Sequence, residues 1–455
     1  MITIALNWEW FILTCFIIGV SRLLFLRFLP FKLISITTAA TVGFGAFLVL
    51  PILGYSNLFA ISLRDYSLYV CLAYFSFLTG ASLARRLFVG RESPKIKFTP
   101  GADQTTFAAI FCVLWLAILL GEFFLKCGFV HMWDVIFGGW AHIQLLTQIG
   151  ELMQSNQGFS YLDAGKILLD DMFCCFWVIL YMKVPKRALV IWTVFIITNL
   201  GDYISRSSLL ELVLVPFFAY VLLNRPSAKK LTVLSGILLL ISLIFFSWDS
   251  SIRLGLNPSV TADKVFSDTM RDAGDSAVPA TVILARNIRG QPSTYIIGLA
   301  TFLIPRSIWN NKPNLQYNYD MTYLLTGMLI GQGTSVITST MLGEAWYYFG
   351  WSGTIWLMLV FGFFAYFFES FLGNNIYFLG LFFEIFYLTI IEVRSEFIAY
   401  YQSGIAALVA AMVVKVIVEL LSARRKELHG PANLKSIKAK TGLLIKKSSI
   451  NDPGE

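Results

Sequence analysis

Long apolar stretches alternate with short polar ones along most of the chain. Most apolar stretches come close to the ~20 residues that an α-helix needs to cross the hydrocarbon core of a bilayer. The pattern therefore predicts an all-α, polytopic integral membrane protein with about eleven transmembrane helices. The expected spans are 8–26, 33–54, 66–84, 105–125, 166–183, 188–204, 207–224, 231–248, 353–370, 376–392 and 401–421.

The composition agrees with a protein built around its membrane helices. Charged residues make up 14% of the chain, whereas soluble domains carry roughly 25%. The first residues, "MITIALNWEWFILTCF", contain neither a basic n-region nor a small-residue cleavage site, so we expect a first spanning helix and not a signal peptide. The cysteines fall mostly inside apolar stretches without metal-ligand spacing, and we expect them to be small buried side chains.

Basic loops determine the expected orientation. The loops "SRLLFLRFLPFK", "ARRLFVGRESPKIK", "KVPKR" and "NRPSAKK" alternate with loops that are poor in Lys and Arg. Because short cytoplasmic loops are enriched in these residues, we expect these loops and the C-terminus inside and the N-terminus outside. The formal net charge of +8 lies largely in these loops and the tail, so it gives no reason to expect a nucleic-acid partner.

This topology places two long segments on the outer face, residues 127–165 and 249–352. The second segment carries several Lys and Arg residues. Long outer loops are exempt from the positive-inside rule, but so many cations on the outer face call for an explanation. We divide the chain into N-terminal transmembrane helices (1–248), a large outer loop with interfacial helices (249–352), C-terminal transmembrane helices (353–421) and a basic cytoplasmic tail (422–455).

The stretch "FLIPRSIWNNKPN" concentrates cationic, rigid and hydrogen-bonding residues inside this outer loop. The apolar run before it, "YIIGLATFLIP", is too short to span the membrane. We expect Pro305 to end that run and to deliver Arg306 to the outer headgroup plane. Trp309 suits the same level as an interfacial aromatic residue, and Pro313 stiffens the exit.

A second stretch of the outer loop, "IGQGTSVITSTMLGEAWYYFGWSG", predicts a short helix. Thr334 or Ser335 can cap its start, and Gly350 and Gly353 end it before the next span. A helix N-terminus near the membrane can bind an anion. An ordinary amphipathic loop helix explains the pattern equally well, and both interpretations stay open.

Arginines from distant parts of the chain converge on the outer face under this topology. The planar guanidinium donates hydrogen bonds in pairs and stays charged, which suits a diphosphate. Each arginine alone is explained by pairing with an acid such as Asp249, Asp272, Glu392 or Glu396, but the collection on one face points to anion binding. Its members are Arg206, Arg253, Arg271, Arg306 and Arg394.

Other chemistry is sparse. The three histidines lack zinc-site spacing. Asp163, Asp170 and Asp171 could hold a divalent ion, but we favour solvated carboxylates at the outer end of the fifth span. The chain contains neither a Walker loop nor a dinucleotide fingerprint. We therefore expect no metal and no cofactor, and an energy source carried by the substrate.

The chain resembles the oligosaccharide repeat unit polymerases, the Wzy-type family of O-antigen and enterobacterial common antigen polymerases. The resemblance is carried by "FLIPRSIWNNKP", followed some twenty residues later by "GTSVITSTMLGEAWYYFGWSG". Weaker matches are "SRSSLLEL" at Arg206, "MRDAG" at Arg271 and Asp272, and "VRSEF" at Arg394. At Arg206, "YISR" replaces the glycine-rich lead-in of many relatives.

The resemblance implies a GT-C-like glycosyltransferase of the bacterial inner membrane. Such an enzyme moves a growing glycan from undecaprenyl diphosphate to a lipid-linked repeat unit at the periplasmic face, together with a chain-length regulator. On this basis Arg306 and Arg271 are the expected catalytic cations, with Asp272 or Glu344 as the base. The expected substrate-binding residues are Arg206, Arg253, Lys312 and Arg394.

Two alternatives remain. An O-antigen ligase has a similar architecture, but ligases carry a histidine in the large outer loop, and residues 249–352 contain none. A lipid-linked oligosaccharide flippase would place cations along a cavity through the membrane, whereas the middles of the expected spans are nearly free of Lys and Arg.

Overall fold

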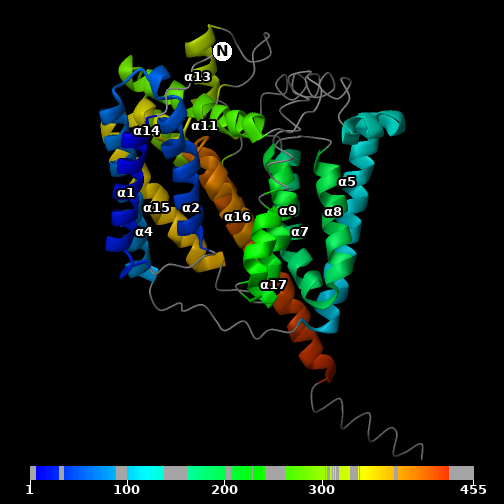
Figure 1. Ribbon diagram of the computed structural model, residues 1–455. Coiled ribbons are helices and arrows are strands. Elements are labelled where there is room, and N and C mark those ends of the chain that lie inside the picture. Colours follow the sequence, from blue (N-terminus) through cyan, green and yellow to red (C-terminus); the bar gives the residue numbers. More distant parts are fainter. Residues whose placement is uncertain are drawn as a thin grey trace, which may run out of the picture.

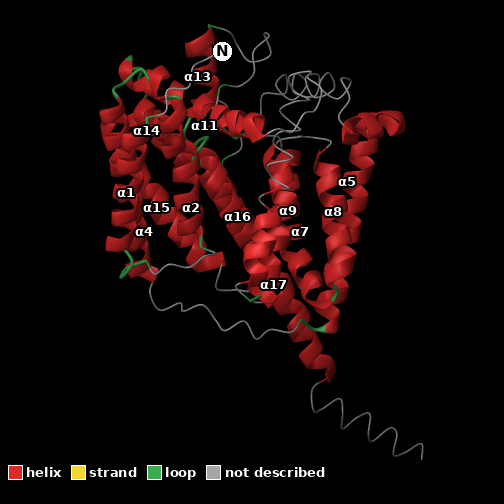
Figure 2. Ribbon diagram, in the orientation of Figure 1, coloured by secondary structure: helices red, strands yellow, loops and turns green. Residues whose placement is uncertain are grey.

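A computed structural model provides the structure of the protein. It describes residues 7–29, 35–88, 100–137, 161–200, 206–224, 229–238, 262–302, 317–327, 339–372 and 378–429, with a few single residues between these ranges. Within these ranges every regular element is a helix, as the sequence predicts (Figures 1 and 2).

The described α-helices are distributed over both halves of the chain. The N-terminal half contains α1 (Trp8–Leu24), α2 (Ile36–Phe44), α3 (Leu50–Gly54), α4 (Leu63–Phe88), α5 (Ala102–Phe137), α7 (Tyr161–Lys183), α8 (Pro185–Leu200) and α9 (Arg206–Asn224). The C-terminal half contains α11 (Ala262–Ala285), α12 (Pro292–Thr301), α13 (Tyr317–Thr326), α14 (Met341–Phe349), α15 (Gly353–Leu372), α16 (Leu379–Glu392) and α17 (Phe397–His429).

Long apolar helices make this a membrane protein. In the part of the chain that the structure describes, five helical segments are long and apolar enough to cross a bilayer. The finer prediction of about eleven spans stays a prediction, since α1, α8 and α16 are shorter and α7 carries several charged residues. The five segments are Ile36–Gly54, Leu63–Phe88, Ala102–Gly121, Met341–Leu372 and Phe397–Leu421.

Glycines bring α4 and α15 into backbone contact. A Cβ atom at Gly80 would overlap the carbonyl oxygen of Leu359, and one at Gly362 would overlap that of Phe77. Small residues permit such close approach between membrane helices, where lipid removes the hydrophobic drive for association.

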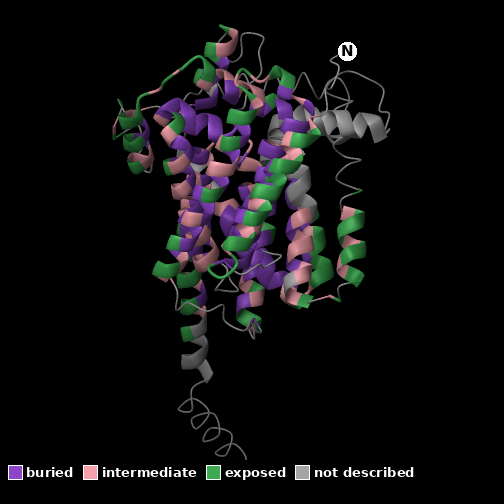
Figure 3. Ribbon diagram, turned by 60° about the vertical axis from the view of Figure 1, so that its left-hand side comes forward, coloured by how far each residue is buried: buried purple, intermediate pink, exposed green. Residues whose placement is uncertain are grey.

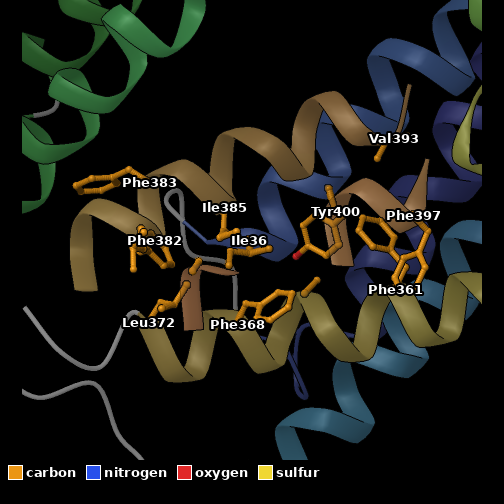
Figure 4. Packing of buried hydrophobic residues seen from close by; sticks show 14 of the residues in the cluster. Ile36, Phe361, Phe368, Leu372, Phe382, Phe383, Ile385, Val393, Phe397 and Tyr400 are labelled. Carbon is orange, nitrogen blue, oxygen red and sulfur yellow. The ribbon is translucent and has the colours of Figure 1, made fainter. Parts of the chain in front are cut away.

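A core of aromatic and aliphatic side chains from α15, α16 and α17 adjoins this pair (Figure 4). The Phe361 ring lies edge-on to Tyr400, with ring centroids 5.1 Å apart, and Tyr400 also contacts Phe368. Buried residues lie mainly on the faces that the helices turn toward one another (Figure 3).

The basic ends of α1 and α4 meet at one end of the bundle. An Arg22 Nη1 donates to the carbonyl oxygen of Leu29 at 3.0 Å, and Arg85 donates to that of Phe28. The Arg86 guanidinium lies over the Phe28 ring, 5.0 Å from its centroid. The C-terminal part of α17 lies at this same end, and α11, α13 and α14 lie at the opposite end (Figure 1). Which end faces the cytoplasm stays a prediction.

Candidate functional site

Hydrogen bonds join α11, α12, α13, α14 and the α16–α17 turn at one end of the bundle. The Thr340 N–H donates to the carbonyl oxygen of Ser276 on α11 at 3.3 Å. The Met341 N–H donates to the carbonyl oxygen of Val393 at 3.2 Å. Segments that lie more than fifty residues apart in the sequence are thereby placed around α14.

Local sequence explains the bounds of α14. The Thr340 hydroxyl accepts from the Gly343 N–H at 3.3 Å and caps the start. The helix ends at Gly350, whose φ of 65° and ψ of −156° suit glycine alone. The predicted end before Gly353 is thus confirmed. The predicted cap at Thr334 or Ser335 is wrong, because the residue at the cap is Thr340.

The N-terminus of α14 does not resemble an open anion site. Its Met341 amide is taken by Val393 and its Gly343 amide by the Thr340 side chain. The helix also places an acid, Glu344, in its own first turn. Neither of the two interpretations that the sequence left open is right, because the helix start is not open and the helix is not amphipathic: all residues from Met341 to Tyr348 are buried.

Glu344 caps a different helix, α17. Its side chain is fully buried. One carboxylate oxygen accepts from the Tyr295 hydroxyl on α12 at 3.0 Å, and the other accepts from the Phe397 N–H. The Ile398 N–H also donates to the carboxylate. Because a helix N-terminus presents unpaired amides and a partial positive charge, a carboxylate at this place joins α12, α14 and α17.

Two further carboxylates surround the same N-terminus. Glu392 accepts from the Glu396 N–H and from the Ser395 hydroxyl, and Glu396 accepts from the Asn318 N–H on α13. Burial raises the pKa of Glu396 to about 7 against the ordinary 4.5, although the Asn318 hydrogen bond lowers it. This carboxyl group therefore changes charge near neutral pH.

The tyrosines around this cluster are held neutral. Burial, followed by the nearby Glu344 carboxylate, raises the pKa of Tyr295 well above its ordinary value. Burial does the same for Tyr317, although the nearby Ser339 side chain lowers its pKa. Neither hydroxyl is an acid at neutral pH, and the Tyr295 hydroxyl acts as a hydrogen-bond donor to Glu344.

Asn318 on α13 joins two neighbouring segments. Its amide oxygen accepts from the Ser339 N–H at 3.2 Å, and its Nδ2 donates to the Ser395 hydroxyl at 3.4 Å. One side chain thus holds the approach to α14 against the turn that follows α16. The sequence gives little indication that Asn318 joins two segments, because an Asn near a helix end is common and does not reveal its distant partners.

Arg289 caps the C-terminus of α14. Its Nη1 donates to the carbonyl oxygen of Trp346 at 2.9 Å, and its Nε donates to the Asn287 side chain at 2.8 Å. The Gly290 N–H donates to the carbonyl oxygen of Tyr347 at 2.9 Å. A cation suits this helix end, where carbonyl groups lack partners. At least one cation of the outer loop, Arg289, therefore has a structural role that the sequence did not predict.

The site residues expected from the sequence fall into four groups. Glu344 and Arg394 lie at this junction, Arg394 within the α16–α17 turn, where its N–H donates to the carbonyl oxygen of Ile391 at 2.9 Å. Arg271 and Asp272 lie on α11, which packs against α14, but their side chains lie outside the described structure. Arg206 is the first residue of α9, which packs against α8 and α16.

The fourth group lies outside the described residues. They are Arg253, Arg306 and Lys312, so the placement of Arg306 at the outer headgroup plane stays a prediction. Residues 295–301 of the apolar run before Arg306 lie in α12, a helix of ten residues that ends at Thr301, so the expectation that Pro305 ends this element is wrong. One of its faces buries Tyr295 against Glu344, while Ile296 is 57% exposed on the opposite face.

A second set of carboxylates lies between α5, α7 and α16. The Trp115 indole N–H donates to Asp170 Oδ1 at 2.8 Å, and Asp171 forms a hydrogen bond with Glu384. Asp171 is only 3% exposed. The expectation of solvated carboxylates is therefore wrong for Asp171, because α16 covers this face of α7. Within the described ranges, no three His, Cys, Asp or Glu side chains are arranged to hold a metal ion.

Compared with protein-family models, with curated proteins and with solved structures, the chain matches none of them.

Proposed function

We propose that this protein is a membrane glycosyltransferase that polymerises lipid-linked oligosaccharide repeat units at the outer, periplasmic face of a bacterial inner membrane. The observation that carries the proposal is the junction around α14. It unites the segment 339–353 with the turn that contains Arg394 and with α11, which carries Arg271 and Asp272. These include the second main segment through which the sequence resembles the repeat unit polymerases and two of the weaker matches.

The proposed reaction exchanges one glycosidic bond for another. An acceptor hydroxyl attacks the anomeric carbon of the donor glycan, and the bond from that carbon to the lipid diphosphate breaks. The leaving diphosphate keeps the electron pair, and a base takes the hydroxyl proton. Guanidinium groups stabilise the charge that develops on the diphosphate. Arg271, Arg306 and Arg394 are proposed for this role, supported by Arg206, Arg253 and Lys312.

The arrangement favours different roles for the two candidate bases. The oxygens of Glu344 accept from Tyr295, Phe397 and Ile398, and the side chain is fully buried. A carboxylate so engaged suits a positioning residue, which holds the turn of Arg394 against α12 and α14. Asp272 is then the proposed base, one residue from Arg271 on α11.

The proposal is tested on purified protein with a lipid-linked repeat unit as both donor and acceptor. Arg394→Ala and Arg306→Ala should each lower turnover on the order of 10²-fold, as for loss of one donor to a developing anion. Lysine at either position should recover only part of the activity, because an ammonium lacks the planar fork. Arg286→Ala is the matched control, since Arg286 is an exposed arginine of the same loop. Normal turnover in both alanine variants, measured per folded molecule, would refute the proposal.

A lipid-linked oligosaccharide flippase is the second candidate, and one observation favours it. Asp171 and Glu384 are adjacent carboxyl groups between helices α7 and α16, and ionisable residues within membrane helices often mark transport pathways. A deletion strain separates the two functions. Loss of polymer with single repeats retained in the periplasm supports the polymerase, whereas loss of repeats from the periplasm supports the flippase.

A further inference from the structure

The α16–α17 turn is held by carboxylates whose charges oppose one another. Glu344 accepts from two amides of α17, Glu392 accepts from the Glu396 N–H, and Glu396 accepts from the Asn318 N–H. Three negative charges at one helix N-terminus exceed the partial charge of about +0.5 that its amides supply. The packed turn therefore favours a state in which at least one of the carboxyl groups is neutral.

Hydrogen-bond geometry distinguishes Glu396 and Glu392 from Glu344. Among the described residues, each of the two has a buried Oε2 without a hydrogen-bond partner. Of the two, Glu396 lies in the turn itself and accepts from the Asn318 N–H, so its charge acts directly on the contact between the turn and α13. Glu344, by contrast, has donors on both oxygens. A buried carboxylate oxygen that lacks a donor is costly when charged, so a proton on this group removes more repulsion than it forfeits in hydrogen bonding.

The groups that act on Glu396 come from every neighbouring element. Two acids and three neutral tyrosines interact with it, and the cation Arg394 lies two residues before it in the turn. These groups are Tyr295 on α12, Tyr317 on α13, Glu344 and Tyr348 on α14, Glu392 on α16 and Arg394 in the turn.

We propose that Glu396 is a proton-sensitive latch on the α16–α17 turn, protonated while the turn is packed against α13 and α14 and ionised when the turn opens. Burial, which places the pKa of this group at about 7, sets the range over which the latch responds. The latch goes beyond the glycosyltransferase proposal and does not depend on it, because its readout is the packing of the turn.

Opening is measured by amide hydrogen exchange of the peptide 393–400 in the full-length protein, compared at each pH with Glu396→Gln. The exchange rate of the unmodified protein divided by that of Glu396→Gln cancels the intrinsic pH dependence of exchange. Between roughly pH 5 and 7 the ratio should rise by up to about tenfold per pH unit, and it should level off above about 7. The matched control is Glu419→Gln, a change at an exposed carboxylate of the same helix, and its ratio should stay near one.

Three results would overturn the latch. The first is a ratio that does not change with pH. The second is an equal rise of the exchange-rate ratio in residues 63–88, which would mean that the whole bundle opens and not the turn alone. The third is failure of Glu396→Gln to fold at pH 7.5, since the packed turn is proposed to contain the neutral form that glutamine imitates.

Discussion

Between α4 and α15 two glycines allow the backbones to touch, whereas around the first turn of α17 the contacts are carboxylates paired with amides and hydroxyls. Both regions are buried, and both join elements that are far apart in the sequence. Between α4 and α15, the shape of the two backbones sets how the helices pack, and any side chain added at the glycines destabilises the contact. At the first turn of α17, hydrogen bonds set how the elements pack, so the chemical identity of each group matters.

The difference teaches which changes each region tolerates. Dispersion contacts between α4 and α15 are many and individually small, so loss of a few atoms is tolerated better than added volume. The turn before α17 contains few contacts, each directional, so removal of one partner leaves the others unpaired. The candidate site lies on the second kind of region, where charge and pH can change the structure.

The largest expected effect comes from adding volume to the shape-determined region. Gly362→Leu places a side chain where the Phe77 carbonyl group lies, and we expect almost no folded protein, because the backbones must separate. Gly19→Leu is the matched control, since no atom lies within 4 Å of its Cβ position. Monodisperse yield in size-exclusion chromatography measures both. Comparable yields of the two variants would contradict the close contact of α4 and α15.

Removal of the shared cap is expected to come next. Glu344→Ala leaves the Tyr295 hydroxyl and two α17 amides without their acceptor, at a cost on the order of 3 kcal/mol in unfolding free energy. Glu344→Gln keeps an oxygen acceptor and should cost about 1 kcal/mol. Denaturant unfolding in detergent provides the comparison. Equal loss in both variants would show that the size of the side chain matters and its hydrogen bonding does not.

A smaller effect is expected at the end of α14. Gly350→Ala introduces a Cβ at a φ of 65° and against the Arg289 guanidinium, and we expect a loss of about 2 kcal/mol. Gly19→Ala serves as the control for a glycine that makes no close contact. The shift in thermal unfolding midpoint should be absent in the control, and its absence in Gly350→Ala as well would contradict the strained cap.

The smallest of the expected effects concerns Arg289. Arg289→Ala removes the hydrogen bond to the Trp346 carbonyl group and its interaction with the helix end, worth about 1 kcal/mol. Arg286→Ala, at an exposed arginine nearby, should change stability by less. If the two variants unfold alike, Arg289 does not stabilise α14.

Some features of this protein follow from the sequence alone. Apolar length and period predict helices, and glycine predicts the end of α14 before Gly353, because both depend on residues close together in the chain. The apolar run before Arg306 is also recognisable as too short to span the membrane, and its residues 295–301 lie in the ten-residue α12.

Only the tertiary structure decided which distant groups meet. Glu344 caps a helix that begins 53 residues later, and Arg289 caps one that ends at residue 349. In the sequence Gly362 and Gly19 are both glycines in apolar stretches, yet only Gly362 lies against another backbone. Propensity and hydropathy are properties of neighbouring residues, whereas such contacts depend on which helix faces pack together, and the packing is set by the whole bundle.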